Sequence, residues 1–185
     1  MQLDTPLTVK EIEFRIQSIN KGGYATILVY KNARVDMQRL DDVYGCLGWQ
    51  RKHSNDNKNC AVSVWCVGKN EWISKEDVGT ESNVDKEKGL ASDSFKRSCF
   101  NWGIGRELYD YPVISIKLSP GEGDNPQYGE WYLQSGKPKA GWGLKLKEWS
   151  WYSEFEGKKI SFLAARDEKG KTRWKWGTMK GENNV

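Results

Sequence analysis

Two adjacent cations near the end of an amphipathic segment are the residues best suited to binding a polyanion. Lys96 and Arg97 belong to the segment 83–102, whose apolar side chains repeat at helical spacing and which ends before Gly103. At 100° per residue, one face of this helix carries Val84, Ala91, Phe95, Cys99 and Trp102. Cations beside a buried aromatic face could grip a phosphate backbone. The alternative, that both cations are simply solvated, stays open from the helix alone.

A second set of cations lies near the C-terminus. In the expected strand 171–177, basic residues alternate with tryptophans. Lys171, Arg173 and Lys175 share one face and form a second candidate DNA-binding set, because a basic row suits a phosphate backbone. A solvated strand face explains the same alternation equally well.

The sequence offers no catalytic constellation. Residues 165–172 resemble a loose phosphate-binding loop, but a true one precedes a helix and here the strand pattern RWKWG follows. The acid pairs 41–42 and 76–77 have no evident third carboxylate for two-metal chemistry. His53 lies in the polar segment RKHSNDNKN, interpreted as a loop, which is a poor context for a catalytic base. We therefore expect no enzymatic activity, no catalytic residue and no cofactor.

Cysteine spacing and composition narrow the class of protein. The four cysteines form no CxxC pair, so we expect no metal site and reduced thiols. No signal peptide is evident, and no apolar run approaches the roughly 18 residues of a membrane span. We therefore expect a cytoplasmic protein without a membrane partner. A net charge of +4 means that any nucleic-acid surface must come from the arrangement of charges. Ten tryptophans and eight tyrosines admit stacking on bases or on sugars.

The segments that position these residues predict an α+β fold. Residues 5–19 start with a capping-box pattern and are interpreted as a short helix, although apolar alternation at 12, 14 and 16 leaves a strand open. Strands are expected at 24–30, 60–67, 71–75 and 113–118, and helices at 34–44 and 83–102. This order predicts an antiparallel β-sheet with the long helix packed across it.

The C-terminal third predicts a change of organisation. Residues 119–143 are rich in glycine and proline and predict a loop or linker. Residues 144–177 predict a C-terminal β meander with a turn at 167–170. The expected division is a core of residues 1–118, a linker of 119–143, a meander of 144–177 and a flexible tail of 178–185.

Five segments within residues 11–106 resemble, in order, the single-strand annealing proteins of the Rad fifty-two family, which occur in eukaryotes and bacteriophages. EIEFRIQSINKGGYATILVYKNARV is similar to that family's opening helix and strand, and GCLGW to its GxxGW turn. CAVSVWCVGKNEW is similar to its β-hairpin, EDVG to its turn into the long helix, and DSFKRSCFNWG to the Asp-x-x-Lys-Arg end of that helix. The C-terminal meander lies outside the resemblance.

The resemblance implies residue roles. The family binds single-stranded DNA in a groove around the outside of a ring or filament, with the bases displayed for pairing. By position, Lys96 and Arg97 correspond to cations of the groove floor, and Arg34 to an arginine that binds the DNA backbone. Lys69 corresponds to a hairpin lysine at a second DNA site, and Arg15 to an arginine of the first helix.

This chain departs from the family pattern at two places. Phe100 stands where the family commonly has another basic residue, and it could stack on a base or simply pack. The stretch between Gly79 and Lys88 is shorter than in the family. Lys86 and Lys88 therefore remain DNA-binding candidates that cannot be mapped one to one.

The expected function is ATP-independent binding and annealing of single-stranded DNA in homologous recombination, by an oligomeric ring or filament of bacteriophage type. The expected partners are single-stranded DNA, further copies of the chain and a host or phage single-stranded-DNA-binding protein, in the host cytoplasm if a phage encodes the chain. The alternatives are an aromatic-rich carbohydrate-binding or structural β-protein and a metal-dependent nuclease.

Overall fold

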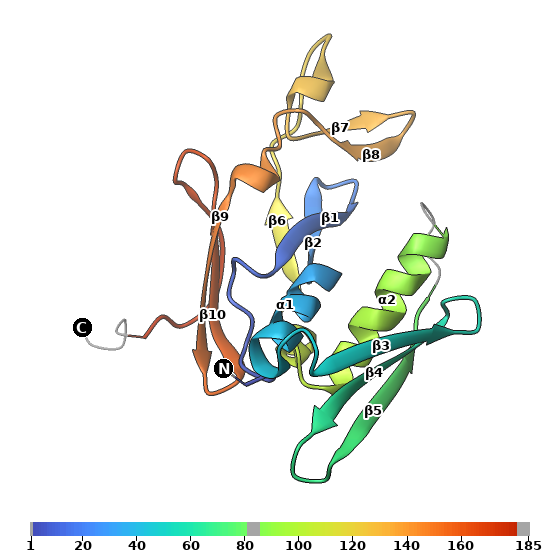
Figure 1. Cartoon of the computed structure of the whole chain (residues 1–185). Coiled ribbons are helices and arrows are strands. Elements are labelled where there is room, and N and C mark those ends of the chain that lie inside the picture. Colours follow the sequence, from blue (N-terminus) through green and yellow to red (C-terminus); the bar gives the residue numbers. More distant parts are fainter. Residues whose placement is uncertain (1, 81–85, 181–185) are drawn as a thin grey trace. The chain divides into compact units, whose positions relative to one another are not determined.

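The computed structural model describes residues 2–80 and 86–180 (Figure 1). The chain divides into two units, of which the first comprises Met1–Leu7 and Lys31–Arg106 and the second Thr8–Tyr30 and Glu107–Val185. This division differs from the expected one, which joined residues 1–118 in a single core. The chain crosses between the units at several points because strands from both ends of the sequence share one core.

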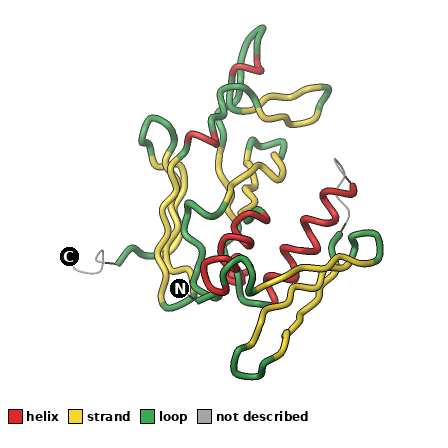
Figure 2. The backbone as a smooth tube through the Cα atoms, viewed as in Figure 1, coloured by secondary structure: helices red, strands yellow, loops and turns green. Residues whose placement is uncertain are grey.

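In its described residues, the first unit combines two helices with a three-stranded antiparallel sheet (Figure 2). The helices are α1, Ala33–Tyr44, and α2, Lys86–Asn101. The sheet has the order β3-β4-β5, with β3 at Trp49–Ser54, β4 at Asn59–Cys66 and β5 at Glu71–Val78. Helix α2 contacts β4, β5 and α1.

Local sequence signals explain where the two helices begin and end. The Asn32 side chain caps α1 by accepting hydrogen bonds from the amides of Arg34 and Val35, at 2.9 and 3.3 Å. Helix α2 ends before Gly103, whose φ of +97° confirms the predicted helix stop. Phe95 and Cys99 are fully buried, as their shared helical face predicts. The expected start of this helix at residue 83 lies outside the described residues.

The second unit contains two three-stranded antiparallel sheets and a two-stranded hairpin. The first sheet has the order β1-β2-β6, with β1 at Glu13–Ile19, β2 at Tyr24–Tyr30 and β6 at Ile114–Lys117. The second has the order β11-β10-β9, with β9 at Ser150–Glu156, β10 at Lys159–Arg166 and β11 at Thr172–Gly177. The hairpin is formed by β7, Trp131–Gln134, and β8, Lys137–Ala140. Short 3-10 helices lie at Arg106–Asp110, Pro126–Tyr128 and Leu146–Glu148.

Side chains from both three-stranded sheets form the core of the second unit. The buried cluster comprises Ala25, Ile27, Ile114, Ile116, Leu118, Trp149, Ile160, Leu163 and Ala165. Neither sheet can bury its apolar face alone, so the expected meander is part of the same unit as β1, β2 and β6. The meander itself and its turn are confirmed, since the Gly170 amide donates to the Asp167 carbonyl at 2.9 Å.

The short helix expected within residues 5–19 is wrong, and the strand that the apolar alternation left open is present. Its capping contact does form, because the Thr8 amide donates to the Glu11 carboxylate at 2.9 Å. From Glu13 onward, however, the chain is β1, which pairs with β2 and places Phe14 opposite Val29. Cross-strand pairing and burial of alternate side chains therefore override the local helix signal.

Two further segments are more ordered than expected. The polar segment around His53, interpreted as a loop, begins as strand β3, which pairs with β4 and leaves the turn at residues 55–58. The expected linker, residues 119–143, contains the β7–β8 hairpin. Its glycines permit close backbone approach, since a Cβ at Gly121 would lie 1.6 Å from the Pro126 carbonyl oxygen. The glycines of residues 119–143 therefore allow close packing of the backbone and do not mark a linker.

The expected fold class, α+β with antiparallel sheets, is confirmed at this level. The specific arrangement of the single-strand annealing family stays a prediction. Within residues 2–80 and 86–180, no helix is long and apolar enough to cross a membrane.

Candidate functional site

Lys96 and Arg97, called the cation pair below, form only long ion pairs with the residues that the structure describes. The Lys96 ammonium lies 4.0 Å from Asp93, and Arg97 Nε lies 3.7 Å from Asp77. Both distances exceed hydrogen-bond length, so each contact is a weak ion pair. Asp93 is already engaged, because it accepts from the amide of Thr80 at 2.9 Å. The side chains of the pair are 24% and 43% exposed, which leaves both cations able to accept an anionic partner.

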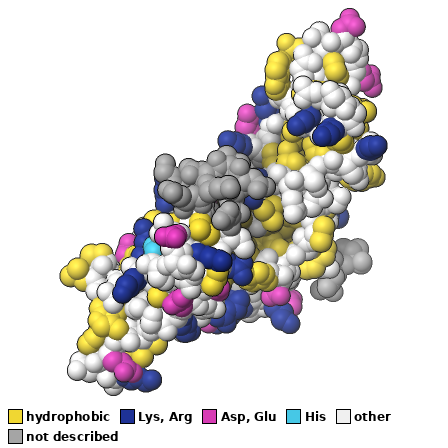
Figure 3. All heavy atoms as spheres, turned by 90° about the vertical axis from the view of Figure 1, so that its right-hand side faces the viewer, with side chains coloured by type: hydrophobic (Ala, Val, Ile, Leu, Met, Phe, Trp, Pro, Cys, Tyr) yellow, Lys and Arg dark blue, Asp and Glu magenta, His cyan; other side chains and the backbone are white. Residues whose placement is uncertain are grey.

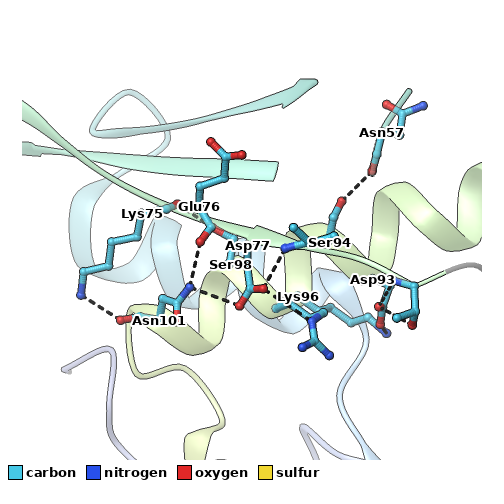
Figure 4. A network of polar contacts seen from close by, with 12 residues as sticks. Asn57, Lys75, Glu76, Asp77, Asp93, Ser94, Lys96, Ser98 and Asn101 are labelled. Atoms are coloured by element: carbon cyan, nitrogen blue, oxygen red, sulfur yellow. Dashed lines mark hydrogen bonds and ion pairs between the residues drawn. The ribbon is translucent and has the colours of Figure 1, made fainter. Parts of the chain in front are cut away.

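Hydrogen bonds from β5 fix the end of α2 that bears the cation pair (Figure 4). The Lys75 ammonium donates to the Asn101 carbonyl at 2.8 Å, and the Ser98 hydroxyl donates to the Lys75 carbonyl at 2.8 Å. The Asn101 amide group donates to the Glu76 carbonyl and to the Asp77 carboxylate, at 3.2 and 3.3 Å. The backbone of the cation pair is therefore positioned before any ligand arrives.

A buried ion pair between Lys31 and Asp36 lies next to the C-terminal end of α2. Lys31 and Asp36 are both buried and form an ion pair, and the Lys31 ammonium also donates to the Ile104 carbonyl at 2.8 Å. Burial raises the pKa of Asp36 to about 6, although Lys31 opposes the shift. The Lys31 ammonium lies 4.0 Å from the centre of the Phe100 ring, so this ring packs on an internal cation.

Sequence reasoning missed Lys31 and Asp36. Burial is unusual for both residue types, and no local pattern marks it. A lone lysine next to a helix cap and an acid in the first helical turn read as ordinary surface residues.

Among the other expected DNA-binding residues of the first unit, Arg34 and Lys69 lie at its surface. Arg34 is exposed in the first turn of α1. Lys69 lies at the turn between β4 and β5, with its side chain 67% exposed and 4.0 Å from Glu71. Lys86 and Lys88 belong to α2, but their side chains lie outside the description. The first unit therefore carries seven of the eight primary candidates, including Phe100.

Arg15, the eighth candidate, belongs to the second unit. It lies on β1 and not on a helix, and it is exposed. Its guanidinium group stacks over the ring of Tyr30 at 5.1 Å. Its placement separates it from the unit that carries the other candidates.

The second candidate set does not form a row of equivalent cations. Lys171 and Lys175 are exposed, but the Arg173 side chain is only 12% exposed. Arg173 donates two hydrogen bonds to the Glu130 carboxylate, at 2.6 and 2.8 Å, and lies 3.5 Å from Asp167. Burial opposes ionisation of Glu130, but Arg173 and the Ser119 amide outweigh it, so its pKa is lowered. The charge of Arg173 is therefore matched by internal carboxylates.

Two tryptophans close in sequence to the candidate cations, Trp102 and Trp174, are also engaged in contacts within the protein. Trp102 donates from its indole nitrogen to the Val62 carbonyl at 3.0 Å and lies under Lys75, 4.4 Å from its ammonium. Trp174 packs against the core of the second unit. Neither ring is presented as an open stacking platform.

The residues considered for catalysis have structural partners. Asp41 accepts a hydrogen bond from the Trp49 indole at 2.7 Å, and Asp42 accepts one from Gln38 at 2.7 Å. His53 has a lowered pKa, owing first to burial and then to Arg51. Within the described residues, no group of three or more His, Cys, Asp or Glu side chains is arranged to hold a metal ion.

The four thiols, Cys46, Cys60, Cys66 and Cys99, are free. Burial raises the pKa of Cys60 to about 11, and burial also raises the pKa of Cys99. Both buried cysteines are therefore poor nucleophiles, since the thiolate is the reactive form. Cys46 is exposed in the turn after α1.

Basic and acidic side chains are interspersed on the face of the molecule drawn in Figure 3. Comparison with known proteins adds no family assignment to this geometry. No protein-family model matches the chain, and no curated protein matches it. The likeness of residues 11–106 to single-strand annealing proteins thus stays a prediction from the segments quoted above.

Proposed function

We propose that this chain binds single-stranded DNA and anneals complementary strands without ATP, as a bacteriophage-type protein of homologous recombination. The observation that carries the proposal is the cation pair, whose partly exposed side chains form only long ion pairs within residues 2–80 and 86–180. Exposed Arg34 and Lys69 in the same unit and the resemblance of residues 11–106 to the Rad fifty-two family support it. On this proposal, α2 is the family's long helix and β3–β5 is the sheet that it crosses.

Annealing needs electrostatics and geometry, and no covalent step. Two strands of DNA repel each other until cations neutralise part of their phosphate charge. Lys96, Arg97 and Arg34 contact phosphates and release counterions, so affinity falls as salt rises. Phosphate contacts carry no sequence information, and the base edges remain free to test pairing.

Self-association is part of the proposal because one protomer offers few cations. Copies joined in a ring or filament repeat the cation pair along the strand, which raises the overall affinity without any new kind of contact. A single-stranded-DNA-binding protein of the host or phage is the partner that presents the strand, in the host cytoplasm.

Annealing of two complementary oligonucleotides in EDTA and without ATP tests the proposal. We expect the wild-type protein to pair the strands faster than they pair alone, and increasing salt to suppress the gain. The proposal fails if pairing is not accelerated, or if ATP or a divalent metal is strictly required. Strand cleavage after addition of Mg²⁺ would indicate a nuclease instead.

A carbohydrate-binding function is the second candidate, favoured by one pair of aromatic rings. Tyr128 and Trp142 are both exposed, and their ring centres lie 5.1 Å apart at an interplanar angle of 80°. Exposed rings of this kind stack on sugars as well as on bases. Filter binding of a polysaccharide that exceeds binding of single-stranded DNA, and that is lost on Trp142→Ala, would favour this candidate.

A further inference from the structure

Strand β1 leaves one edge of its sheet unpaired. The sheet order is β1-β2-β6, and among the described strands β1 pairs with β2 alone. An edge strand presents a row of backbone N–H and C=O groups that can pair with another extended chain. The register shifts between Ile16 and Ser18, so the part of this edge considered below is residues 14–16.

A groove follows this edge within the second unit. It consists of two neighbouring hollows of about 520 and 360 Å³, which share Phe14, Arg15, Leu146 and Lys147. Phe14 and Arg15 are consecutive in a strand and project to opposite faces of the sheet. Because both line the same hollows, the groove follows the edge of β1 and is not confined to one face.

The floor of the groove is apolar and already packed. The ring of Phe14 stacks on Trp151, with centroids 3.6 Å apart and an interplanar angle of 3°. Leu144 and Leu146 are half-buried and pack against the core of the unit. A chain lying in the groove would therefore meet apolar side chains on its floor.

The rim of the groove is basic. Four exposed cations line the two hollows: Lys10, Arg15, Lys145 and Lys147. Within the described residues, none of these four forms an ion pair. Two acids, Glu13 and Glu148, also line the groove, and Glu13 accepts a hydrogen bond from the Tyr30 hydroxyl at 2.5 Å. Positive charge exceeds negative charge along the rim.

We propose that this groove docks an extended, acidic segment of another protein, which adds to β1 as a strand. The unpaired backbone of β1 supplies hydrogen bonds, the apolar floor accepts alternate side chains, and the rim cations select aspartate or glutamate at the others. A peptide fits better than a nucleic acid, because DNA has no backbone amides to match the edge and the two aromatic rings already stack on each other. The inference is independent of the proposed annealing function.

Binding of a labelled eight-residue peptide of alternating aspartate and valine, followed by fluorescence anisotropy, tests the inference. We expect saturable binding, and slower amide hydrogen exchange in residues 14–16 on binding. The same peptide with alternate amides N-methylated should bind at least about tenfold more weakly, because it cannot complete the strand. Equal affinity of the methylated peptide, or no binding of the unmodified one, overturns the proposal.

Charge reversal locates the peptide on the protein. Arg15→Glu with Lys147→Glu should weaken binding by at least about tenfold. The matched control reverses two exposed cations of β10, Lys159→Glu with Arg166→Glu, and should leave affinity unchanged. Equal loss in both variants would mean non-specific attraction and would overturn the site, as would an oligo-dT strand that binds this groove and displaces the peptide. The methylated-peptide comparison uses unaltered protein, so it decides the question even if the variants unfold.

Discussion

Arg97 and Arg173 show how differently the two units use the same side chain. Arg97 is 43% exposed and its nearest carboxylate contact, to Asp77, is 3.7 Å long. Arg173 is 12% exposed, donates two hydrogen bonds to the Glu130 carboxylate and lies beside Asp167. Both arginines stand in basic, tryptophan-containing segments of the sequence.

The difference shows that the carboxylates around an arginine, and not the arginine itself, decide whether its charge is available to a ligand. Glu130 lies 43 positions from Arg173 in the sequence, so its pairing is invisible to any local pattern. A cation with matched internal carboxylates fixes the fold, whereas a cation with long contacts keeps its charge for a ligand.

Arg173→Met should have the largest effect on stability. It leaves the carboxylates of Glu130 and Asp167 without their cation, and losing one partner of a largely buried pair costs about 3–5 kcal/mol. Urea unfolding measures the loss. Lys175→Met, an exposed neighbour on β11, should change the free energy of unfolding by less than about 0.5 kcal/mol. If Arg173→Met left stability intact and weakened DNA binding, Arg173 would be a ligand-binding residue like Arg97, and the contrast between the two arginines would be wrong.

Asp36, which is buried, and Glu130, which is partly buried, should respond to pH in opposite directions. Burial raises the pKa of Asp36 from 3.8 to about 6, so between these values the folded state holds more protons and loses stability as pH rises. The pKa of Glu130 is lowered from 4.5, so its contribution is present above pH 4.5 and is lost as pH falls through the folded value.

Unfolding between pH 4 and pH 7 separates these two contributions. Relative to Asp36→Asn, the wild type should lose about 2 kcal/mol as pH rises through this range. Relative to Glu130→Gln, it should instead gain stability. Parallel pH curves for the wild type and Asp36→Asn would show that Asp36 titrates normally and would remove this part of the comparison.

Lys69→Ala should have the smallest effect on stability. The side chain is 67% exposed and its contact with Glu71 is 4.0 Å long, so the free energy of unfolding should change by less than about 0.5 kcal/mol. Thermal unfolding checks this. A loss of several kilocalories would mean that the turn between β4 and β5 depends on this lysine.

Segments with strong local signals could be predicted from the sequence. The Gly103 stop marks a helix end, and the burial of Phe95 and Cys99 follows from helical spacing. Strand β2 likewise follows from its β-branched and aromatic residues. These features depend on residues close together in the chain.

Features that depend on distant partners could not be predicted. Phe14 becomes part of a strand because Val29 lies opposite it, although the preceding residues favour a helix. The burial of Lys31 depends on Asp36 and on the Ile104 carbonyl, the latter 73 positions away. The positions of Lys96 and Arg97 on one helix could be predicted. The contacts of Lys31 and Asp36 beside that helix could not.

Salt-dependent binding of single-stranded DNA by Lys96→Ala with Arg97→Ala tests the central claim most directly. If both cations contact phosphates, affinity should fall about tenfold, and the slope of log affinity against log salt should become shallower by about 1.4, or about 0.7 for each lost contact. Lys159→Ala with Arg166→Ala removes the same charges from β10 and should change neither quantity. Wild-type affinity and slope in the Lys96 and Arg97 variant, with its fold intact, would contradict the account.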